Sequence, residues 1–163
     1  MDKKICIAID AMGGENSPNK NIEGIKFFYN KNKDRDDFFF NIFGDESKVA
    51  PLLKHYKIPE KYFKIFHSSS VVSDEETPLT AVKTSKNSSM WNSVFSQTKS
   101  ESDISLSAGN TGVLLVISRM ILKTISGVSK PALAGLWPNN IGMNIVLDLG
   151  ANIECSDQNL VDF

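Results

Sequence analysis

Short apolar runs alternate along this chain with amphipathic stretches, and this alternation predicts a series of strands and helices. The first apolar run covers residues 5–10, and a glycine-rich loop separates it from a helical pattern over residues 19–30. A nearly continuous apolar run at 38–43 is typical of a strand that is buried on both faces. A third strand is expected at 62–67.

Capping residues predict where the helices begin. Ser47 is expected to cap a helix that extends through Tyr56, with Pro51 tolerated in its first turn. Thr77 and Pro78 indicate another helix start, and one or two helices are expected from there to about residue 97, with a break near residues 87–89. The acidic residues 74–76 just before that start favour the helix dipole, an explanation we prefer to a metal site.

The last third of the chain repeats the pattern and adds a hairpin. A strand from Ile104 leads into a helix that extends to Ile125, and two further strands are expected at 132–136 and 145–148, joined by a turn at 138–140. The last connection is too short for a helical crossover, so these two strands should be antiparallel. The whole pattern predicts a three-layer α/β fold with a mainly parallel sheet, helices on both faces and a local antiparallel hairpin.

The chain ends at a pattern that resembles the first turns of a helix. Asp157 is placed as its N-cap, and the pattern stops at Phe163. We therefore expect residues 1–163 to be the N-terminal part of a single α/β domain that is truncated near residue 163.

Composition narrows the function classes only slightly. The chain has 163 residues, 41% of them hydrophobic, and a formal net charge of −1 with lysines interspersed among acids, so nothing indicates a nucleic-acid partner. Cys6 and Cys155 indicate neither a disulfide framework nor a metal site, which favours the cytoplasm. No secretory signal is recognisable, and the apolar run 113–125 is too short and too charged to span a bilayer.

Three strand ends carry small residues together with Asp, Ser or Asn, namely residues 10–14, 107–112 and 148–152. Ligands of parallel sheets bind outside the carboxyl ends of the strands, so these loops could converge on one crevice. At 107–112 a strand passes through small residues into a helix, whose free N–H groups and dipole favour a phosphate or carboxylate. The alternative is a tight turn with nothing bound, and Asp10 and Asp148 could equally cap the turns that follow them.

The sequence also resembles a known family. Residues 10–14 (Asp-Ala-Met-Gly-Gly), 86–90 (Lys-Asn-Ser-Ser-Met), 107–112 (Ser-Ala-Gly-Asn-Thr-Gly), 131–134 (Pro-Ala-Leu-Ala) and 148–152 (Asp-Leu-Gly-Ala-Asn) occur here in order. Together they resemble the N-terminal half of the bacterial phosphate acyltransferase family, PlsX, from Ile5 to Phe163. Glu15 and Lys130 depart from the pattern, in which Asp and Arg are usual, and Lys offers a point charge where Arg offers a planar fork.

The resemblance implies a fold shared with the isocitrate/isopropylmalate dehydrogenases and with phosphotransacetylases. It also implies a reaction, in which inorganic phosphate attacks an acyl-acyl carrier protein to give acyl phosphate for phospholipid synthesis. Catalysis would consist of positioning phosphate and stabilising an oxyanion. The residues we expect to take part are Asn110, Asp148 and Asn152 in catalysis, and Asp10, Gly13, Gly14, Lys86, Ser107, Gly109, Thr111, Gly112 and Lys130 in phosphate binding.

The partners implied by the resemblance are acyl carrier protein, inorganic phosphate and a second copy of the chain in a homodimer. No metal or other cofactor is expected. The protein is expected in the cytoplasm, with a peripheral membrane contact through the missing half left open.

Alternative interpretations remain. Without the resemblance, Lys86 and Lys83 are surface charges, and His55 and His67 are structural. A phosphotransacetylase-like enzyme or a decarboxylating dehydrogenase is the other enzyme class considered, although the carboxylate cluster and nucleotide loop of a dehydrogenase are not apparent. A non-catalytic fragment that keeps an anion pocket is the alternative from outside the enzymes.

Overall fold

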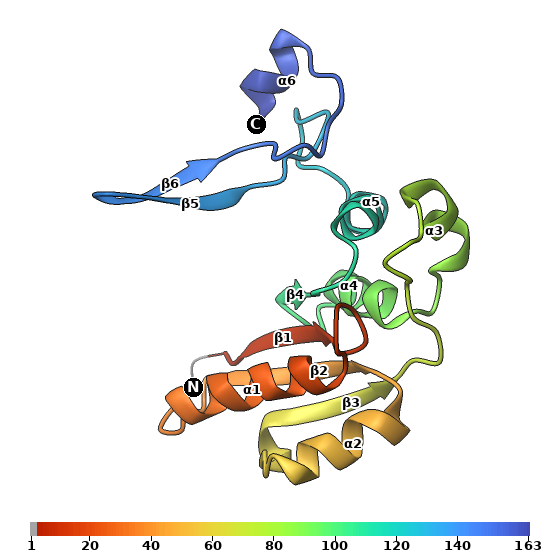
Figure 1. The fold of residues 1–163 in the computed structure, drawn as a ribbon, viewed down its shortest axis with the longest axis vertical. Coiled ribbons are helices and arrows are strands. Elements are labelled where there is room, and N and C mark those ends of the chain that lie inside the picture. Colours follow the sequence, from red (N-terminus) through yellow and green to blue (C-terminus); the bar gives the residue numbers. More distant parts are fainter. Residues whose placement is uncertain (1–2) are drawn as a thin grey trace.

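The fold is built on a four-stranded parallel sheet, and the computed structural model describes residues 3–163 (Figure 1). The sheet consists of β1 (Ile5–Asp10), β2 (Phe38–Gly44), β3 (Phe63–His67) and β4 (Ile104–Leu106) in the order β3-β2-β1-β4. Its register pairs Ile9 with Ile42 on one side and with Leu106 on the other. The α/β class expected from the sequence is therefore confirmed.

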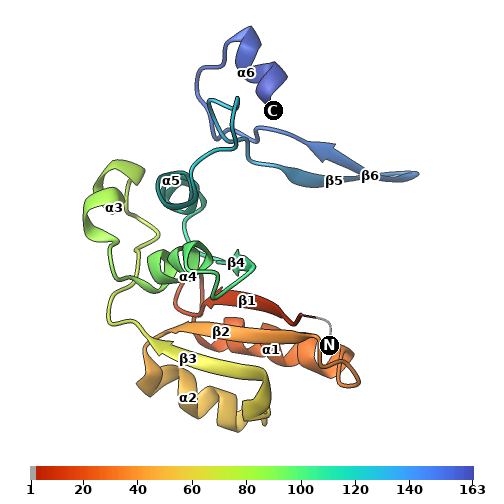
Figure 2. The same cartoon turned by 180° about the vertical axis from the view of Figure 1, so that it is seen from behind.

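Helices cover both faces of this sheet, because the central strands β1 and β2 carry apolar side chains on both faces. On one face lie α1 (Asn19–Lys31) and α2 (Glu46–His55), whose Ile22, Ile25, Val49 and Leu53 join the strands in one buried core. On the other face lies α4 (Ser89–Thr98). Figures 1 and 2 show α4 between the sheet and a further layer formed by α5 (Thr111–Leu122), with α3 (Pro78–Thr84) beside it.

The outer helices form a second, smaller core. It contains the buried residues Val72, Ala81, Met90, Val94, Val113 and Ile117, so α3, α4 and α5 pack around one another. The helix break expected at residues 87–89 lies between α3 and α4, where Ser88 caps α4 by accepting a hydrogen bond from the Trp91 amide at 3.1 Å.

The remaining elements project away from the sheet. Among the described residues, the strands β5 (Gly135–Asn139) and β6 (Gly142–Val146) pair only with each other, as an antiparallel hairpin, and α6 (Asp157–Asp162) follows them. Both views place the hairpin and α6 on the far side of α5 from β1 (Figures 1 and 2). A short 3₁₀ turn at Glu60–Tyr62 precedes β3.

Several expected boundaries were wrong. Asp45, not Ser47, caps α2, because its carboxylate accepts hydrogen bonds from the amide and the hydroxyl of Ser47. Pro51 therefore lies in the second turn. The cap of α6 is Ser156 rather than Asp157, in a reciprocal pair with Asn159.

The last helix and the hairpin also differ from expectation. The helix α5 ends at Leu122 because Lys123 takes a positive φ of 63°. Both hairpin strands are displaced by about three residues, since the turn lies at Asn140 and Ile141 and Pro138 is inside β5.

Candidate functional site

The candidate site lies where β1 and β4 end. The chain progresses from β1 to β2 to β3 in one direction and then returns to place β4 on the other side of β1. Such a reversal opens a crevice between the carboxyl ends of the two strands, which is where open α/β sheets bind ligands. The expected loops 10–14 and 107–112 leave the sheet at this point.

The loop after β1 is wound around a buried carboxylate. Asp10 is only 1% exposed, and its Oδ1 accepts hydrogen bonds from the amides of Met12 and Gly13, both at 3.2 Å. From the first turn of α1, the side-chain amide of Asn21 donates to the carbonyls of Asp10, Ala11 and Gly13 at 2.9–3.3 Å. These bonds hold the glycine-rich loop in one conformation.

The second loop is tied to the first through the same carboxylate. The Ser107 hydroxyl donates to Oδ2 of Asp10 at 2.7 Å and accepts from the Gly109 amide at 3.1 Å. A β-carbon on Gly13 would overlap the Asp10 carboxylate and lie 3.0 Å from the Gly109 nitrogen. Gly14 has a φ of +91°, and a β-carbon there would lie 2.6 Å from the Ala108 carbonyl oxygen. Glycine is thus required by the close approach of the two loops.

Asn110 caps α5. Its Oδ1 accepts from the Val113 amide at 3.1 Å, and its Nδ2 donates to the carbonyls of Asp74 and Glu76, each at 3.0 Å. Within residues 3–163, no acceptor is found for the amides of Thr111 and Gly112. The helix start therefore presents two N–H groups that a ligand could use, while the Asn110 side chain is engaged within the chain.

Lys86 takes no part in these contacts. It is exposed in the link between α3 and α4, and within residues 3–163 it makes no hydrogen bond or ion pair. Met90, at the end of the expected motif 86–90, packs against Gly109: its Cε would lie 2.9 Å from a β-carbon at that position.

The remaining expected residues form a separate cluster from the segments that precede and follow the hairpin. Asn152 donates to Oδ1 of Asp148 at 2.9 Å and to the Pro131 carbonyl at 3.0 Å, and Lys130 donates to the Glu154 carbonyl at 2.9 Å. The expectation that three strand ends share one crevice is therefore confirmed for β1 and β4 and wrong for β6, because β6 pairs only with β5.

Cys155 belongs to this second cluster. Its thiol donates to Oδ2 of Asp148 at 3.5 Å, and partial desolvation of the sulfur followed by that carboxylate raises the pKa of Cys155. The thiol is thus kept protonated at neutral pH, so it is a hydrogen-bond donor rather than a nucleophile.

A family model described as "Fatty acid synthesis protein" matches residues 5–163, which is nearly the whole described chain. The chain belongs to this family. Among its relatives are the phosphate acyltransferases of Pelagibacter ubique, 49% identical over 163 residues, and of Rhodospirillum rubrum, 38% identical over 163 residues. The alignments cover all of this chain but 47% and 46% of those proteins, so the chain spans about half the length of the curated relatives it matches.

A solved structure shares the fold of this fatty acid synthesis family member. The EutD phosphotransacetylase from Staphylococcus aureus superposes with a TM-score of 0.60 at 16% identity, over 98% of this chain and 50% of that one. The fold relationship to phosphotransacetylases expected from the resemblance is therefore confirmed.

Sequence reasoning missed Asn21 and the contact between Cys155 and Asp148. Asn21 had a weak signal, since it is an amide residue in the first turn of a helix that follows a glycine-rich loop. The thiol contact had none, because it depends on how the chain folds back after residue 150. Within residues 3–163 no helix combines the length and the apolar composition that a membrane span requires.

Proposed function

We propose that this chain forms part of an enzyme that transfers a fatty acyl group from acyl-acyl carrier protein to inorganic phosphate. The observation that carries the proposal is the junction of the two loops at the β1–β4 crevice, fixed by the hydrogen bond between Ser107 and Asp10. It leaves the amides of Thr111 and Gly112 at the start of a helix, an arrangement suited to phosphate. The phosphate acyltransferase relatives support the choice of reaction.

The reaction needs little covalent help from the protein. A phosphate oxygen attacks the thioester carbonyl carbon, the carbonyl oxygen becomes an oxyanion, and the C–S bond then breaks. The products are acyl phosphate and a carrier thiolate, which takes up a proton. Phosphate is already largely ionised near neutral pH, so the rate depends on holding it in line and on donors aimed at the oxyanion.

The residues of the loops 10–14 and 107–112 are assigned to phosphate binding. The amides of Thr111 and Gly112 would bind the phosphate oxygens, and Gly13, Gly14 and Gly109 would serve phosphate binding by letting the two loops meet closely. The roles of Asp10 and Ser107 would be to fix the loops, because their mutual hydrogen bonds already use those groups. Lys86 would act only if the link that carries it bends toward the crevice.

The residues of the second cluster are assigned to catalysis together with Asn110. Asn152 or Asn110 would donate to the oxyanion, and Asp148 would assist proton transfer to the leaving thiolate. Lys130, in the same cluster, would instead supply its cation to the bound phosphate. In each case an existing hydrogen bond within the chain would have to be exchanged for one to substrate. These assignments therefore require the second cluster to move toward the first.

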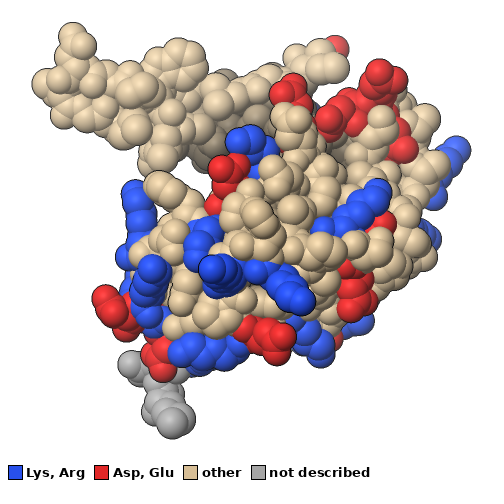
Figure 3. Space-filling model, turned by 60° about the horizontal axis from the view of Figure 1, so that its bottom comes forward, with Lys and Arg blue, Asp and Glu red and all other residues tan. Residues whose placement is uncertain are grey.

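The proposed partners are an acyl carrier protein and a second copy of the chain, in the cytoplasm and with an optional contact at the membrane surface. Figure 3 shows lysine and arginine side chains gathered over the face formed by α1, α2 and β3, with fewer acids among them. Exposed lysines there include Lys54, Lys57 and Lys64, which line the surface between α2 and β3. This charge would attract an acidic carrier.

The test uses a protein of the relatives' length. Incubated with acyl-acyl carrier protein and phosphate, it should form a product that hydroxylamine converts to a hydroxamate, with neither metal nor nucleotide added. The Asn110→Ala variant should lose turnover more than phosphate affinity if this side chain serves the oxyanion. A requirement for NAD, or a strong preference for acetyl-CoA, would instead support the dehydrogenase or phosphotransacetylase alternative.

The 163-residue chain alone should be inactive in the same assay. Its crevice at β1 and β4 is open to water, which weakens each polar contact to phosphate. Crystals soaked in phosphate or tungstate should still show an anion at Thr111 and Gly112. Turnover by a monomer of this length, or density at another place with the loop closed, would contradict these two expectations.

A further inference from the structure

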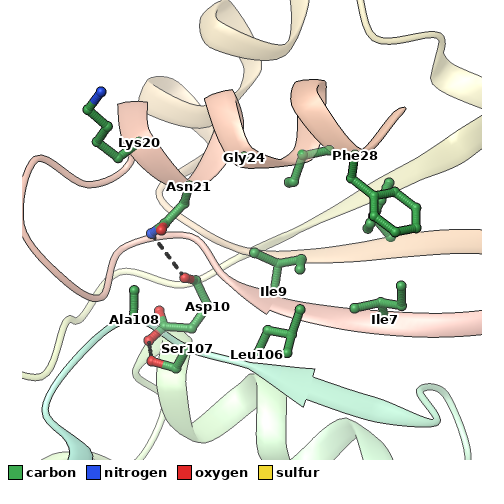
Figure 4. Close-up of a pocket in the computed structure, with 12 residues that line it drawn as sticks. Ile7, Ile9, Asp10, Lys20, Asn21, Gly24, Phe28, Leu106, Ser107 and Ala108 are labelled. Carbon is green, nitrogen blue, oxygen red and sulfur yellow. Dashed lines mark hydrogen bonds between the residues drawn. The ribbon is translucent and has the colours of Figure 1, made fainter. Parts of the chain in front are cut away.

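A mostly apolar groove of about 330 Å³ starts at the candidate site and lies between α1 and the strands β1 and β4 (Figure 4). Its volume is at the lower end of the range that is usual for small-ligand pockets, ~300–1,000 Å³. β4 is an edge strand of the sheet, and Leu106 on it is 50% exposed, so the groove is open along one side. Apolar surface that is open to water in this way gains free energy when an apolar molecule covers it.

The groove changes character along its length. One end is formed by Asp10, Asn21 and Ser107, the residues that fix the two loops of the candidate site. Lys20 lies at the same end, beside Asn21 on α1 (Figure 4). Away from that end the groove is lined by hydrophobic side chains, of which Figure 4 labels Ile7, Ile9, Phe28 and Leu106, and Ile25 and Phe40 line it as well. From Asp10 to Ile7 the strand spans about 10 Å at its ~3.3 Å rise per residue. A ligand that fits has a polar head at the loops and an extended apolar tail.

Gly24 creates the room in the middle of the groove. It lies on α1 between Asn21 and Phe28, and a β-carbon there would meet no atom within 4 Å. Glycine weakens a helix interior relative to alanine, and the packing among residues 3–163 gives no reason for it. The empty space above Gly24 is therefore part of the groove rather than of the core.

We infer that this groove binds the acyl chain of the substrate and that Gly24 sets how long a chain it accepts. The inference rests on the proposed acyl transfer, because the groove itself indicates only an apolar ligand and the proposed reaction identifies that ligand as an acyl chain. The thioester carbonyl lies at the end formed by Asp10 and Ser107, and from Ser107 the same loop continues to Thr111 and Gly112 at the start of α5. The methylenes lie along β1 under α1, where each one leaves water for contact with apolar side chains.

The first experiment measures binding without catalysis. A series of fatty acids from hexanoate to dodecanoate is titrated into the 163-residue chain, with methyl NMR signals of Ile7, Ile9 and Leu106 as the readout. Each added methylene should strengthen binding by up to about fourfold until the groove is filled. Gly24→Leu should weaken dodecanoate binding by at least tenfold and leave hexanoate within about twofold, because only the longer chain passes Gly24.

Gly142→Leu is the matched control. Gly142 also has open space at its β-carbon, but it lies in the hairpin outside the groove, so dodecanoate affinity should stay the same. If both variants bind dodecanoate like the parent, or if the methyl signals of the hairpin respond in place of those in the groove, the inference is wrong. Circular dichroism of both leucine variants shows whether the fold is kept. Gly24→Ala adds a single methyl group that contacts no neighbouring atom, so it should narrow the groove less than leucine and weaken dodecanoate binding less.

The second experiment separates this inference from the proposed function. In a protein of the relatives' length, Gly24→Leu should lower acyl phosphate formation from long acyl carriers and spare short ones. If acyl phosphate forms and chain-length preference is unchanged, the groove assignment fails while the proposed function stands. If no acyl phosphate forms but dodecanoate binding still depends on Gly24, the reaction is wrong and the acyl groove stands.

Discussion

β2 and the β5–β6 hairpin have similarly apolar sequences but lie in opposite environments. In β2 all residues except Phe39 are buried, because helices cover both faces of the strand and partners lie on both sides. In the hairpin no residue is buried: Trp137 is 60% exposed, Ile145 71% and Ile141 in the turn 99%. An apolar run thus predicts a strand, whereas its burial depends on which other elements reach it.

The same difference separates the two clusters of candidate residues. The Asp10–Ser107 junction is anchored in the sheet and beside the core that α1 and α2 complete, so its geometry is fixed by many packed neighbours. The Asp148–Asn152 cluster is held mainly by local hydrogen bonds next to an exposed hairpin. We therefore expect the first to be rigid and the second to depend on what covers the hairpin. An isolated two-stranded hairpin is only marginally stable in water.

The largest expected effect contrasts two isoleucines. Ile42 in β2 is fully buried, so Ile42→Ala should lower the free energy of unfolding by ~2–5 kcal/mol through lost burial and a cavity. Ile145→Ala in β6 should change it by less than about 0.5 kcal/mol. Urea unfolding followed by circular dichroism measures both. An equally large loss for Ile145→Ala would mean that the hairpin is covered in solution, and dependence on protein concentration would show whether a second copy covers it.

A second contrast concerns glycines. Gly14→Ala should cost roughly 1–3 kcal/mol, because alanine is strained at a φ of +91° and its β-carbon would press on the Ala108 carbonyl. Gly142→Ala in the hairpin meets open space and should stay within about 0.5 kcal/mol of the parent. The same urea titration applies. A neutral Gly14→Ala would show that the two loops are not held together as tightly as the Asp10–Ser107 bond implies.

The sequence was most informative where local pattern and topology rules agreed. The bounds of β1 and α1 were predicted to within one residue, because a buried parallel strand and an amphipathic helix each leave a strong periodic signal. The meeting of the loops after β1 and β4 also followed from the rule for parallel sheets.

The failures have physical causes. Asp45 and Ser47 are both good caps, and only the folded geometry decides between them. The third loop was misplaced because strand pairing is non-local: nothing in residues 142–148 specifies that β6 pairs with β5 alone. The hydrogen bonds from the Asn110 side chain to the carbonyls of Asp74 and Glu76 are also non-local, so the sequence did not predict them.

Helix caps give a third, smaller contrast. Asp45→Ala should lower the free energy of unfolding by about 1 kcal/mol, since α2 contributes Val49 and Leu53 to the core and its cap is lost. Ser156→Ala removes the cap of α6, which packs outside that core, so faster amide exchange in α6 is expected with little change in global unfolding. Hydrogen exchange by NMR distinguishes the two. Global destabilisation by Ser156→Ala would show that α6 is coupled to the sheet.

The smallest effect is a difference in acid response. The hydrogen bond from Lys3, supported by the Cys6 amide, lowers the pKa of Asp103, and hydrogen bonds from the Ser129 amide, Gln158 and the Ser129 hydroxyl lower that of Asp162. A carboxyl with a lowered pKa stabilises the folded state at neutral pH, and this contribution is lost as the pH falls below about 4, through the lowered value.

The two carboxylates should differ in what their protonation releases. Asp103 ties the start of β1 to the segment before β4, so its protonation should lower the urea midpoint as the pH falls below about 4, and Asp103→Asn should flatten part of that decline. Asp162 ties α6 to the Ser129 loop, so acid should free the Ser129 amide to exchange. The urea midpoints of the parent and of Asp162→Asn should depend on pH in the same way. If Asp162→Asn flattened the decline as much as Asp103→Asn, the C-terminal region would be energetically part of the sheet domain, and the contrast between the two regions would be one of solvent exposure alone.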